Sequence, residues 1–86
     1  MRKHGIGFDS AMLVFSDPFA LTGGIRVEDG EQRCQTIGRV KARLVLLVAH
    51  TTRDDDEDGQ PIEVIRIISA RRADPKERRR YEQETR

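Results

Sequence analysis

The sequence predicts an α+β fold, in which a small antiparallel β-sheet of about three to four strands carries an N-terminal helix and a basic C-terminal helix. Three observations support this fold class. Apolar residues recur at helical spacing near the N-terminus, Asp-Gly joins two strand-like runs, and an alternating apolar strand leads directly into an Asp-Pro helix start. A chain of 86 residues has room for one modest core, so we expect a single domain over residues 1–86.

The first predicted element is a short amphipathic helix over residues 8–16. Four apolar residues follow the i, i+3, i+4, i+7 spacing of one helix face: Phe8, Ala11, Met12 and Phe15. Asp17-Pro18 then ends the helix, because proline disfavours the helical conformation in the residue before it. We expect the apolar face of this helix to pack on the core.

A β-hairpin follows the helix. Gly23-Gly24 predicts a turn, and the next strand covers residues 25–28. Asp29-Gly30 is a strong signal for a two-residue hairpin loop. Residues 32–37 form the predicted return strand.

Two longer apolar runs predict the centre of the sheet. Leu44–Ala49 is apolar at odd and even positions, which is typical of a strand covered on both faces. Ile62–Ala70 is the next predicted strand, and its alternation places Arg66 in an otherwise apolar face. A buried guanidinium group without a partner costs several kcal/mol. Arg66 therefore has either an internal ion pair, for example with Glu31, or a part in a functional site.

An acidic block, Asp54–Asp58, lies between these two strands. Adjacent carboxylates repel one another and resist burial, so we expect a solvated loop. Two other interpretations stay open: a divalent-metal site, or an acidic segment that lies over a basic surface and mimics nucleic acid. The spaced ligand pattern of a calcium-binding loop is not present.

The C-terminal segment predicts a basic helix over residues 75–86. Asp74 is the expected N-cap, Pro75 occupies the first turn, and Glu77 follows three residues after the cap. Tyr81 is the only large, partly apolar residue of this helix. Arginine binds phosphate bidentately, so the helix suits RNA. An acidic protein partner, or a solvated helix with intrahelical Glu–Arg pairs, fits the same pattern.

Charge and cysteine content limit the class of protein. Charged residues make up 36% of the chain, but the formal net charge is only +1. Cys34 is the single cysteine, which excludes an intramolecular disulfide and a cysteine-based zinc site and predicts a small core residue. The apolar runs are far shorter than the ~20 residues of a membrane span, and no signal-peptide core is present. We expect a cytoplasmic protein with no metal or other cofactor and no membrane contact.

Four segments of the chain form a recognisable series: "KHGIGFDSAMLVFSDP" (Lys3–Pro18), "GEQRCQTIG" (Gly30–Gly38), "LVLLVAHTTR" (Leu44–Arg53) and "IRIISARRADPKERRRYE" (Ile65–Glu82). Together, and in this order, they resemble the BrnT family of toxins from bacterial type II toxin–antitoxin modules. The last segment is the most specific, because I-R-I-I-S-A-R-x-A is followed by E-R-x-x-Y.

The resemblance implies a RelE-like fold and a metal-independent ribonuclease, an mRNA interferase that inhibits translation. It also implies a BrnA-type ribbon-helix-helix antitoxin, which neutralises the toxin and binds operator DNA, so that the toxin reaches operator DNA only through the antitoxin. A homodimer, or a complex with two copies of each partner, fits this class. The alternative is a catalytically weak interaction protein that binds the antitoxin and contributes to operator autoregulation only in complex.

Motif positions within these segments supply the candidate site. His4 and His50 are the candidate acid and base, because both protonation states of histidine are accessible near neutral pH. The candidates for stabilising the charge of the transition state are Arg33, Arg66 and Arg71. The candidate RNA contacts are Arg72, Arg78, Arg79 and Tyr81.

Three of these positions also have a structural interpretation. Glu31 is the expected counter-ion of Arg33 or Arg66, and His50 suits a hydrogen bond to a carbonyl group. Tyr81 suits an anchor for the last helix as well as a base-stacking platform.

Two features differ from the family pattern. Family members usually begin with a strand that carries an F-x-W-D-like stretch before K-H-G. Either the true start lies upstream, or the N-terminal segment is shortened, and loss of that strand would leave an open sheet edge. The acidic segment Asp54–Gln60 is also longer than is usual before I-R-I-I-S.

Overall fold

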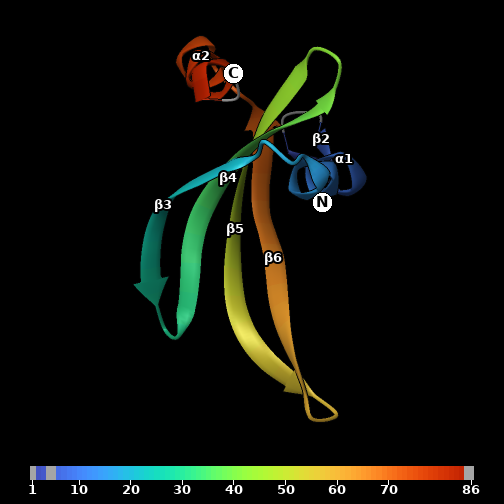
Figure 1. Cartoon of the computed structure of the whole chain (residues 1–86), viewed down its shortest axis with the longest axis vertical. Helices are drawn as coiled ribbons and strands as arrows, with labels where there is room; N and C mark the ends of the chain where they lie inside the picture. The colour runs from blue at the N-terminus through green and yellow to red at the C-terminus, as the bar shows by residue number, and fades with distance from the viewer. Residues whose placement is uncertain (1, 4–5, 85–86) are drawn as a thin grey trace.

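The computed structural model describes residues 2–3 and 6–84 and has the predicted α+β architecture (Figure 1). Its elements in chain order are β1 (Arg2–Lys3), β2 (Ile6–Gly7), α1 (Phe8–Leu13), a 3-10 turn (Val14–Ser16), β3 (Leu21–Glu28), β4 (Glu31–Lys41), β5 (Leu44–Glu57), β6 (Gln60–Arg72) and α2 (Pro75–Glu84). β1 and β2 form a small separate pair. The other strands form one antiparallel sheet in the order β3-β4-β5-β6.

Strand β5 is the buried centre of the sheet, as its apolar run predicts. Four consecutive residues, Val45, Leu46, Leu47 and Val48, are all buried. Because successive residues of a strand point to opposite faces, this run supplies a core on each side of the sheet.

The two helices pack on opposite faces. The first core cluster joins α1 to the sheet and consists of Ile6, Ala11, Val14, Leu46, Val48 and Ala70. The second joins α2 to the other face and consists of Ile37, Val45, Leu47 and Tyr81. We refer to these two surfaces of the sheet as the α1 face and the α2 face.

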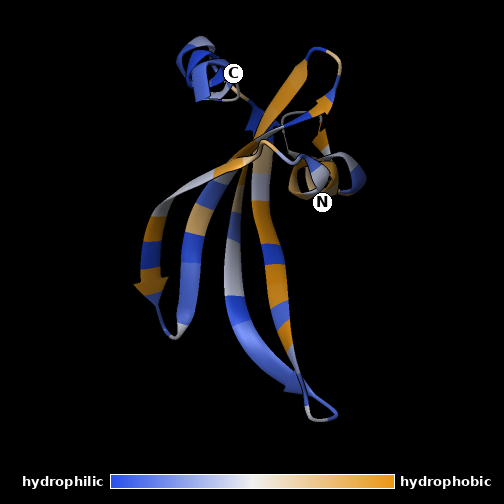
Figure 2. Cartoon of the chain, viewed as in Figure 1, coloured by the Kyte–Doolittle hydropathy of each residue, from blue (hydrophilic) through white to orange (hydrophobic). Residues whose placement is uncertain are grey.

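Both helices lie at one end of the sheet, and the strands extend beyond them (Figure 1). We call this uncovered half, with its two hairpin turns, the hairpin end. There β4 and β5 are hydrophilic, whereas β3 and β6 carry apolar bands (Figure 2). The molecule is accordingly elongated, with extents of 41 × 26 × 22 Å.

Two Asp-Gly turns close the hairpins. Asp29 and Gly30 have φ values of 51° and 77°, and Asp58 and Gly59 have φ values of 52° and 79°. Positive φ at both central residues is the geometry that Asp-Gly favours, and it matches the twist of antiparallel strands. The first hairpin confirms the prediction at Asp29-Gly30.

The second hairpin corrects the prediction for the acidic block. Asp54 to Glu57 belong to β5, and only Asp58 lies in the turn. Pairing with β6 satisfies the backbone of this segment, while its carboxylates alternate between the two faces and stay exposed. Repulsion between the carboxylates therefore keeps the segment in solvent without preventing strand formation.

Two local predictions near the N-terminus also need correction. Gly23 and Gly24 lie within β3, at a β-bulge where Gly24 has a φ of 63°, and not in a turn between elements. The helix over residues 8–16 is present as α1 and the 3-10 turn, but Phe8 and Met12 are 47% and 41% exposed. The buried positions are Ala11 and Val14, because the 3-10 turn shifts the buried side of the segment.

Gly38 of β4 explains how closely the 3-10 turn approaches the sheet. A Cβ atom at this position would lie 2.9 Å from Val14 Cγ1 and 3.0 Å from the Val14 carbonyl oxygen. A larger residue would therefore push Val14 away from the α1 face.

Helix α2 begins with the predicted capping box. The Glu77 N–H donates to Asp74 Oδ1 at 2.8 Å, and the Asp74 N–H donates to Glu77 Oε1 at 2.9 Å. The end predicted at residue 86 lies outside the described residues.

Candidate nucleic-acid interface

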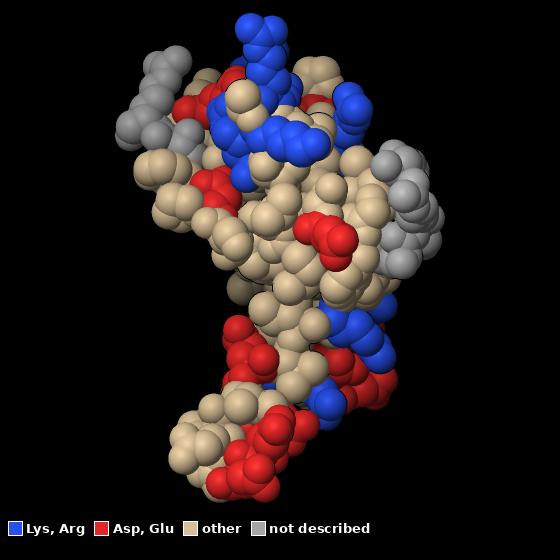
Figure 3. Space-filling model, turned by 90° about the vertical axis from the view of Figure 1, so that its right-hand side faces the viewer, with Lys and Arg blue, Asp and Glu red and all other residues tan. Residues whose placement is uncertain are grey.

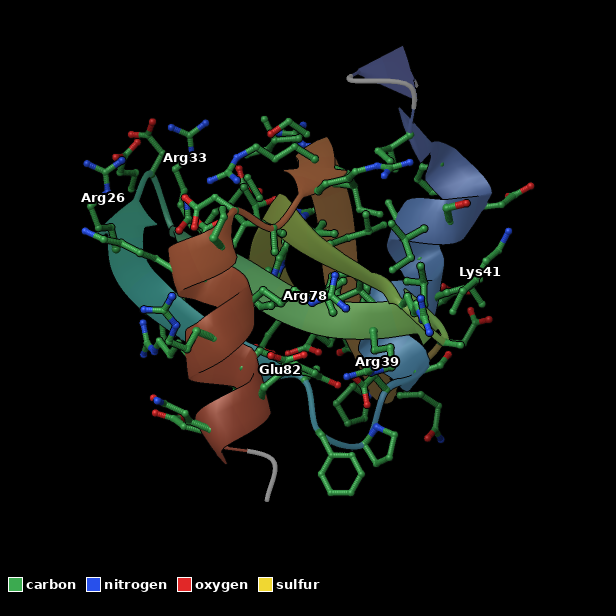
Figure 4. The ribbon with its side chains drawn as sticks, turned by 90° about the horizontal axis from the view of Figure 1, so that it is seen from above. Arg26, Arg33, Arg39, Lys41, Arg78 and Glu82 are labelled. Carbon is green, nitrogen blue, oxygen red and sulfur yellow. The ribbon has the colours of Figure 1, made fainter. Side chains whose placement is uncertain are left out.

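A row of side chains crosses all four strands of the sheet in its hairpin end. The register pairs Arg26 of β3 with Arg33 of β4, Arg33 with Thr51 of β5, and Thr51 with Arg66 of β6. Directly paired residues point to the same face, so these guanidinium groups share one surface. We call Arg26, Arg33, Thr51 and Arg66 the arginine row, and Figure 4 shows its members Arg26 and Arg33 side by side.

The arginine row lies on the α2 face. Arg33 and Ile37 are four residues apart on β4, as are Thr51 and Leu47 on β5, and such residues share a face. Ile37 and Leu47 pack with Tyr81 of α2. The row therefore continues the surface on which α2 sits.

The arginine side chains of the row are accessible. Arg26 and Arg66 are 71% and 72% exposed, whereas Thr51 beneath them is buried. Arg66 thus stands in solvent rather than in a core, because no helix covers this part of the sheet.

The arginine row forms long, exposed ion pairs with neighbouring carboxylates. Glu28 lies 3.6 Å from Arg26 and 3.5 Å from Arg33, and Glu31 lies 3.9 Å from Arg66. Exposed pairs of this length contribute about 0–1 kcal/mol each. A phosphate that accepts two hydrogen bonds from one guanidinium can therefore displace them.

A groove follows the row. It has a volume of about 350 Å³ and is lined in part by Glu31, Thr51, Arg53 and Arg66. An adjoining hollow of about 210 Å³ includes Arg33. The arginine row thus borders an open groove whose lining also carries carboxylates, including Asp29 and Asp54.

Arg71 lies on the same face, closer to α2, where the register pairs it with Leu47. It donates two hydrogen bonds of 2.8 Å to the Glu77 carboxylate. These bonds lower the pKa of Glu77 and raise that of Arg71. The fork of Arg71 therefore holds the start of α2.

The arginines of α2 extend the basic surface toward the helix end. Arg78 pairs with Glu82 at 3.4 Å, and both are labelled in Figure 4. Arg72 and Arg79 are exposed, and no ion pair between described residues involves them. A phosphate could therefore bind these two guanidinium groups without displacing a carboxylate of the described residues.

Tyr81 anchors α2 instead of presenting a ring to solvent. It is 2% exposed, its hydroxyl donates to the Asp17 carboxylate, and the Arg39 guanidinium lies 5.7 Å from its ring centroid. This corrects its expected place among the RNA contacts, because a buried ring cannot stack on a base while α2 is docked. Packing on Val45 and Leu47 is the physical reason.

His50 lies on the α1 face, behind the arginine row. Its ring is 3% exposed, is hydrogen-bonded to Thr36 Oγ1 at 2.8 Å and meets Phe15 edge-on at 4.9 Å. Burial lowers the pKa of His50, so the ring is neutral at neutral pH. By register His50 points away from the arginine row, but one hollow of about 430 Å³ is lined by His50 together with Arg26 and Arg33.

Cys34 is a buried neighbour of His50, in line with its predicted place in the core. Its sulfur lies 3.6 Å from Nδ1 and 3.5 Å from Nε2 of His50. Burial and the charge of Glu63 raise the pKa of the Cys34 thiol. The protonated thiol is therefore a poor nucleophile.

The structure unites only part of the predicted site. Arg33 and Arg66 belong to one row, while His4 lies outside the described residues. The sequence interpretation missed Arg26 and Thr51. Counting outward from the two Asp-Gly turns would have found both, because a two-residue loop fixes the register of each hairpin.

The described residues contain neither a metal-binding cluster nor a membrane-spanning helix. Residues 2–3 and 6–84 contain no group of three or more His, Cys, Asp or Glu side chains placed to hold a metal ion. Within the same residues, neither helix has the length and apolar character to cross a bilayer.

Comparison with known proteins identifies the family of the chain. A search of curated proteins finds none that is similar to this chain. The family model described as "Ribonuclease toxin, BrnT, of type II toxin-antitoxin system" matches residues 1–77. This match spans most of the chain and contains the whole arginine row, so the chain belongs to the BrnT family of ribonuclease toxins of type II toxin–antitoxin systems.

Proposed function

We propose that this chain is a metal-independent endoribonuclease toxin that binds the RNA backbone along the arginine row and inhibits translation. The observation that carries the proposal is the register of Arg26, Arg33 and Arg66, which places guanidinium groups from three strands on one face, where Arg33 and Arg66 line the same open hollow. Adjacent strands lie about 4.8 Å apart, so neighbouring arginines can contact one phosphate or its neighbour.

The arginines supply electrostatic catalysis in this proposal. When a ribose 2′-oxygen attacks the adjacent phosphorus, the P–O5′ bond breaks and negative charge accumulates on the phosphoryl oxygens. Arg33 and Arg66 stabilise that charge through fixed guanidinium groups. Arginine stays protonated, so these residues take no proton.

Proton transfer needs other groups near the row. Among the described residues, Glu28 and Glu31 are the carboxylates at ion-pair distance from its arginines, and each is placed to accept the 2′-hydroxyl proton. His4 is the proposed acid for the leaving 5′-oxygen. His50 acts as a positioning residue, because its bond to Thr36 fixes β5 directly before Thr51.

The remaining arginines bind RNA outside the cleavage point. Arg78 and Arg79 of α2 would contact phosphates that leave the groove, whereas Arg72 of β6 pairs with Leu46 on the α1 face and would contact RNA only beyond the edge of the sheet. Arg71 contributes through its hold on Glu77 and α2. A BrnA-type ribbon-helix-helix antitoxin neutralises this surface and carries the toxin to operator DNA.

The test is cleavage of a fluorescent single-stranded RNA by the purified chain in the presence of EDTA. Arg33→Ala and Arg66→Ala should each lower the cleavage rate about 10²- to 10³-fold, the usual loss when one electrostatic group is removed. Arg43→Ala is the matched control, because Arg43 is an exposed arginine in the β4–β5 turn, at the other end of the sheet.

Three outcomes would contradict the proposal: cleavage that requires a divalent metal, equal loss in the Arg43→Ala variant, or full activity without Arg33 and Arg66. The carboxylate partners of the row favour one other candidate, a catalytically weak interaction protein that binds the antitoxin and acts at operator DNA only in complex. Folded protein that binds an antitoxin but leaves RNA intact would support that candidate.

A further inference from the structure

The α1 face of the hairpin end carries apolar side chains that nothing in the described structure covers. The register places Val27, Gln32, Thr52 and Ile65 in one row across the four strands. Val27 is 69% exposed and Ile65 is 37% exposed. These two residues lie on the outer strands, so the row has an apolar side chain at each edge and polar ones between.

Neighbouring residues enlarge this surface toward α1. Ile25 lies on the same face as Val27, since the two are two residues apart on β3, and it is 58% exposed. Ile67 and Phe15 are half-buried and pack at the edge of the first core cluster. On β6 the apolar side chains therefore continue from Ile65 through Ile67 to the core beneath α1.

An unpaired acidic group borders the surface at the hairpin tip. Asp54 of β5 pairs directly with Glu63 of β6, one row beyond Thr52 and Ile65. Like charges directly opposite on neighbouring strands are destabilising. No ion pair between described residues involves Asp54, Asp56 or Glu63, and Figure 3 shows acidic side chains gathered on this arm. A cationic side chain of a binding partner would reduce this repulsion and so stabilise the pairing of β5 with β6.

We propose that this surface, made of Ile25, Val27 and Ile65 with Asp54 and Glu63 at its border, binds an amphipathic segment of the antitoxin that has basic residues at one end. The proposal rests on the proposed function in one respect, namely that a type II system supplies an antitoxin. Apolar side chains of the segment cover Val27 and Ile65, and its Lys or Arg residues neutralise Asp54 and Glu63.

Charge complementarity selects this occupant over two others. RNA would be repelled by Glu63, which lies on this face and outside the groove beside the arginine row. A second copy is a poorer fit, because residues 6–25 contain no Lys or Arg and carry Asp9 and Asp17, and Arg72, which the register places on the α1 face, lies at the other end of β6 from Glu63. A basic amphipathic helix meets both requirements, since one stripe is apolar and one end is positive.

The proposed antitoxin-binding surface lies on the opposite face of the same strands from the arginine row. Thr51 belongs to the arginine row, and Thr52 belongs to the row that contains Val27 and Ile65. The two threonines are successive residues of β5, so their side chains point to opposite faces. Substitutions of Val27 and Ile65, which line neither hollow beside the arginine row, can therefore be separated from substitutions in the RNA groove, which Asp54 also lines.

The test uses the full 86-residue chain and two synthetic helical peptides of about 18 residues with the same leucine stripe. One peptide ends in a run of lysines and the other in a run of glutamates, and affinity is measured by fluorescence anisotropy at low salt. We expect the lysine peptide to bind at least about tenfold more tightly. Val27→Thr and Ile65→Thr should each weaken it about 3- to 10-fold, and Asp54→Asn with Glu63→Gln should abolish its advantage.

Ile62→Thr is the matched control, because Ile62 is 36% exposed on the same strand but pairs with Asp55, on the other face. Equal binding of both peptides, no measurable binding, or equal loss in Ile62→Thr would overturn the proposal. Dimerisation that Ile65→Thr abolishes would assign the surface to a second copy instead. RNA cleavage by Val27→Thr and Ile65→Thr, measured in parallel, distinguishes failure here from failure of the ribonuclease proposal, which these variants leave unchanged.

Discussion

His50 shows how a single buried side chain couples the fold to pH. Its pKa is lowered by burial, first of all, while the unfolded chain has the ordinary value of 6.5. The unfolded state therefore binds more protons as pH falls, and its share of the population grows. The stability that His50 contributes is complete above pH 6.5 and is lost as pH falls toward the lower folded pKa.

We predict that the free energy of unfolding declines between neutral pH and about pH 5, and that His50→Gln flattens this decline. Urea unfolding at several pH values measures it. His4→Gln is the control, because His4 is the other histidine of the chain. An unchanged slope in His50→Gln would show that other groups cause the decline.

The carboxylates beside the arginine row lead to a second prediction. Glu28→Gln and Glu31→Gln remove anions that compete with phosphate, so each should raise RNA affinity about two- to fivefold, as expected for weak exposed ion pairs. Binding of a short RNA, measured by anisotropy, gives the result. Asp9→Asn makes the same charge change on α1, away from the row.

The same variants separate binding from chemistry. If Glu28 or Glu31 accepts the 2′-hydroxyl proton, its Gln variant binds RNA more tightly but cleaves it more slowly. Tighter binding with faster cleavage would show that the carboxylate is only a counter-ion. Weaker binding would contradict the competition that the distances suggest.

Individual site residues were only partly predictable from the sequence. Arg33 and Arg66 belong to recognisable motifs, whereas Arg26 lies in a stretch that resembles no motif. Arg66 is exposed and Tyr81 is buried because α2 covers the sheet around Tyr81 but does not extend over Arg66. No local pattern contains that information.

At the scale of elements, α2 is held by one polar cluster as much as by its apolar contact. Burial alone would raise the pKa of Asp17, but hydrogen bonds from the Arg39 N–H, the Tyr81 hydroxyl and the Phe19 N–H lower it on balance. Glu77 has a lowered pKa as well. Both carboxylates therefore stabilise the fold above their unfolded pKa values and lose that contribution as pH falls through the folded ones.

Tyr81→Phe should lower the free energy of unfolding by about 1–2 kcal/mol, because it removes a charge-assisted hydrogen bond to Asp17 without leaving a cavity. Urea unfolding at neutral pH provides the measurement, and Arg79→Ala on the exposed side of α2 is the control. A loss no larger than that of the control would mean that apolar packing alone holds α2.

The contact between the 3-10 turn and β4 gives another prediction at this scale. Gly38→Ala should cost about 1–3 kcal/mol, because its new methyl group overlaps Val14. Gly23→Ala is the control, since a Cβ atom there meets nothing within 4 Å. The difference in thermal unfolding temperature between these variants tests it, and equal temperatures would show that Val14 moves aside at no cost.

Element types were more predictable than their limits. The helix start at Asp74 and the strand pair around Asp29-Gly30 follow from local capping and turn chemistry. The acidic end of β5 was wrongly predicted as a loop. Strand pairing with β6 decides its conformation, and charge density alone carries no information about pairing.

At the scale of the whole molecule, covering only one end of the sheet has consequences for stability. Six residues form the first core cluster and four form the second, and both lie beneath the helices. The hairpin end has cross-strand pairs but little core, so its amides should exchange with solvent sooner than those of the helix end. The surfaces proposed to bind RNA and the antitoxin thus occupy the half that we expect to be less stable, where a bound partner would order the strands.

The contrast between the basic helix end and the acidic hairpin tip makes the molecule an electric dipole, although its net charge is only +1. The long axis of 41 Å is several times the screening length of about 8 Å at physiological salt. In dilute buffer the long-range field of a polyanion would turn the molecule so that α2 approaches first. At cellular ionic strength the field of a polyanion acts on each end of the molecule almost independently. Short-range contacts then determine the orientation of the bound molecule.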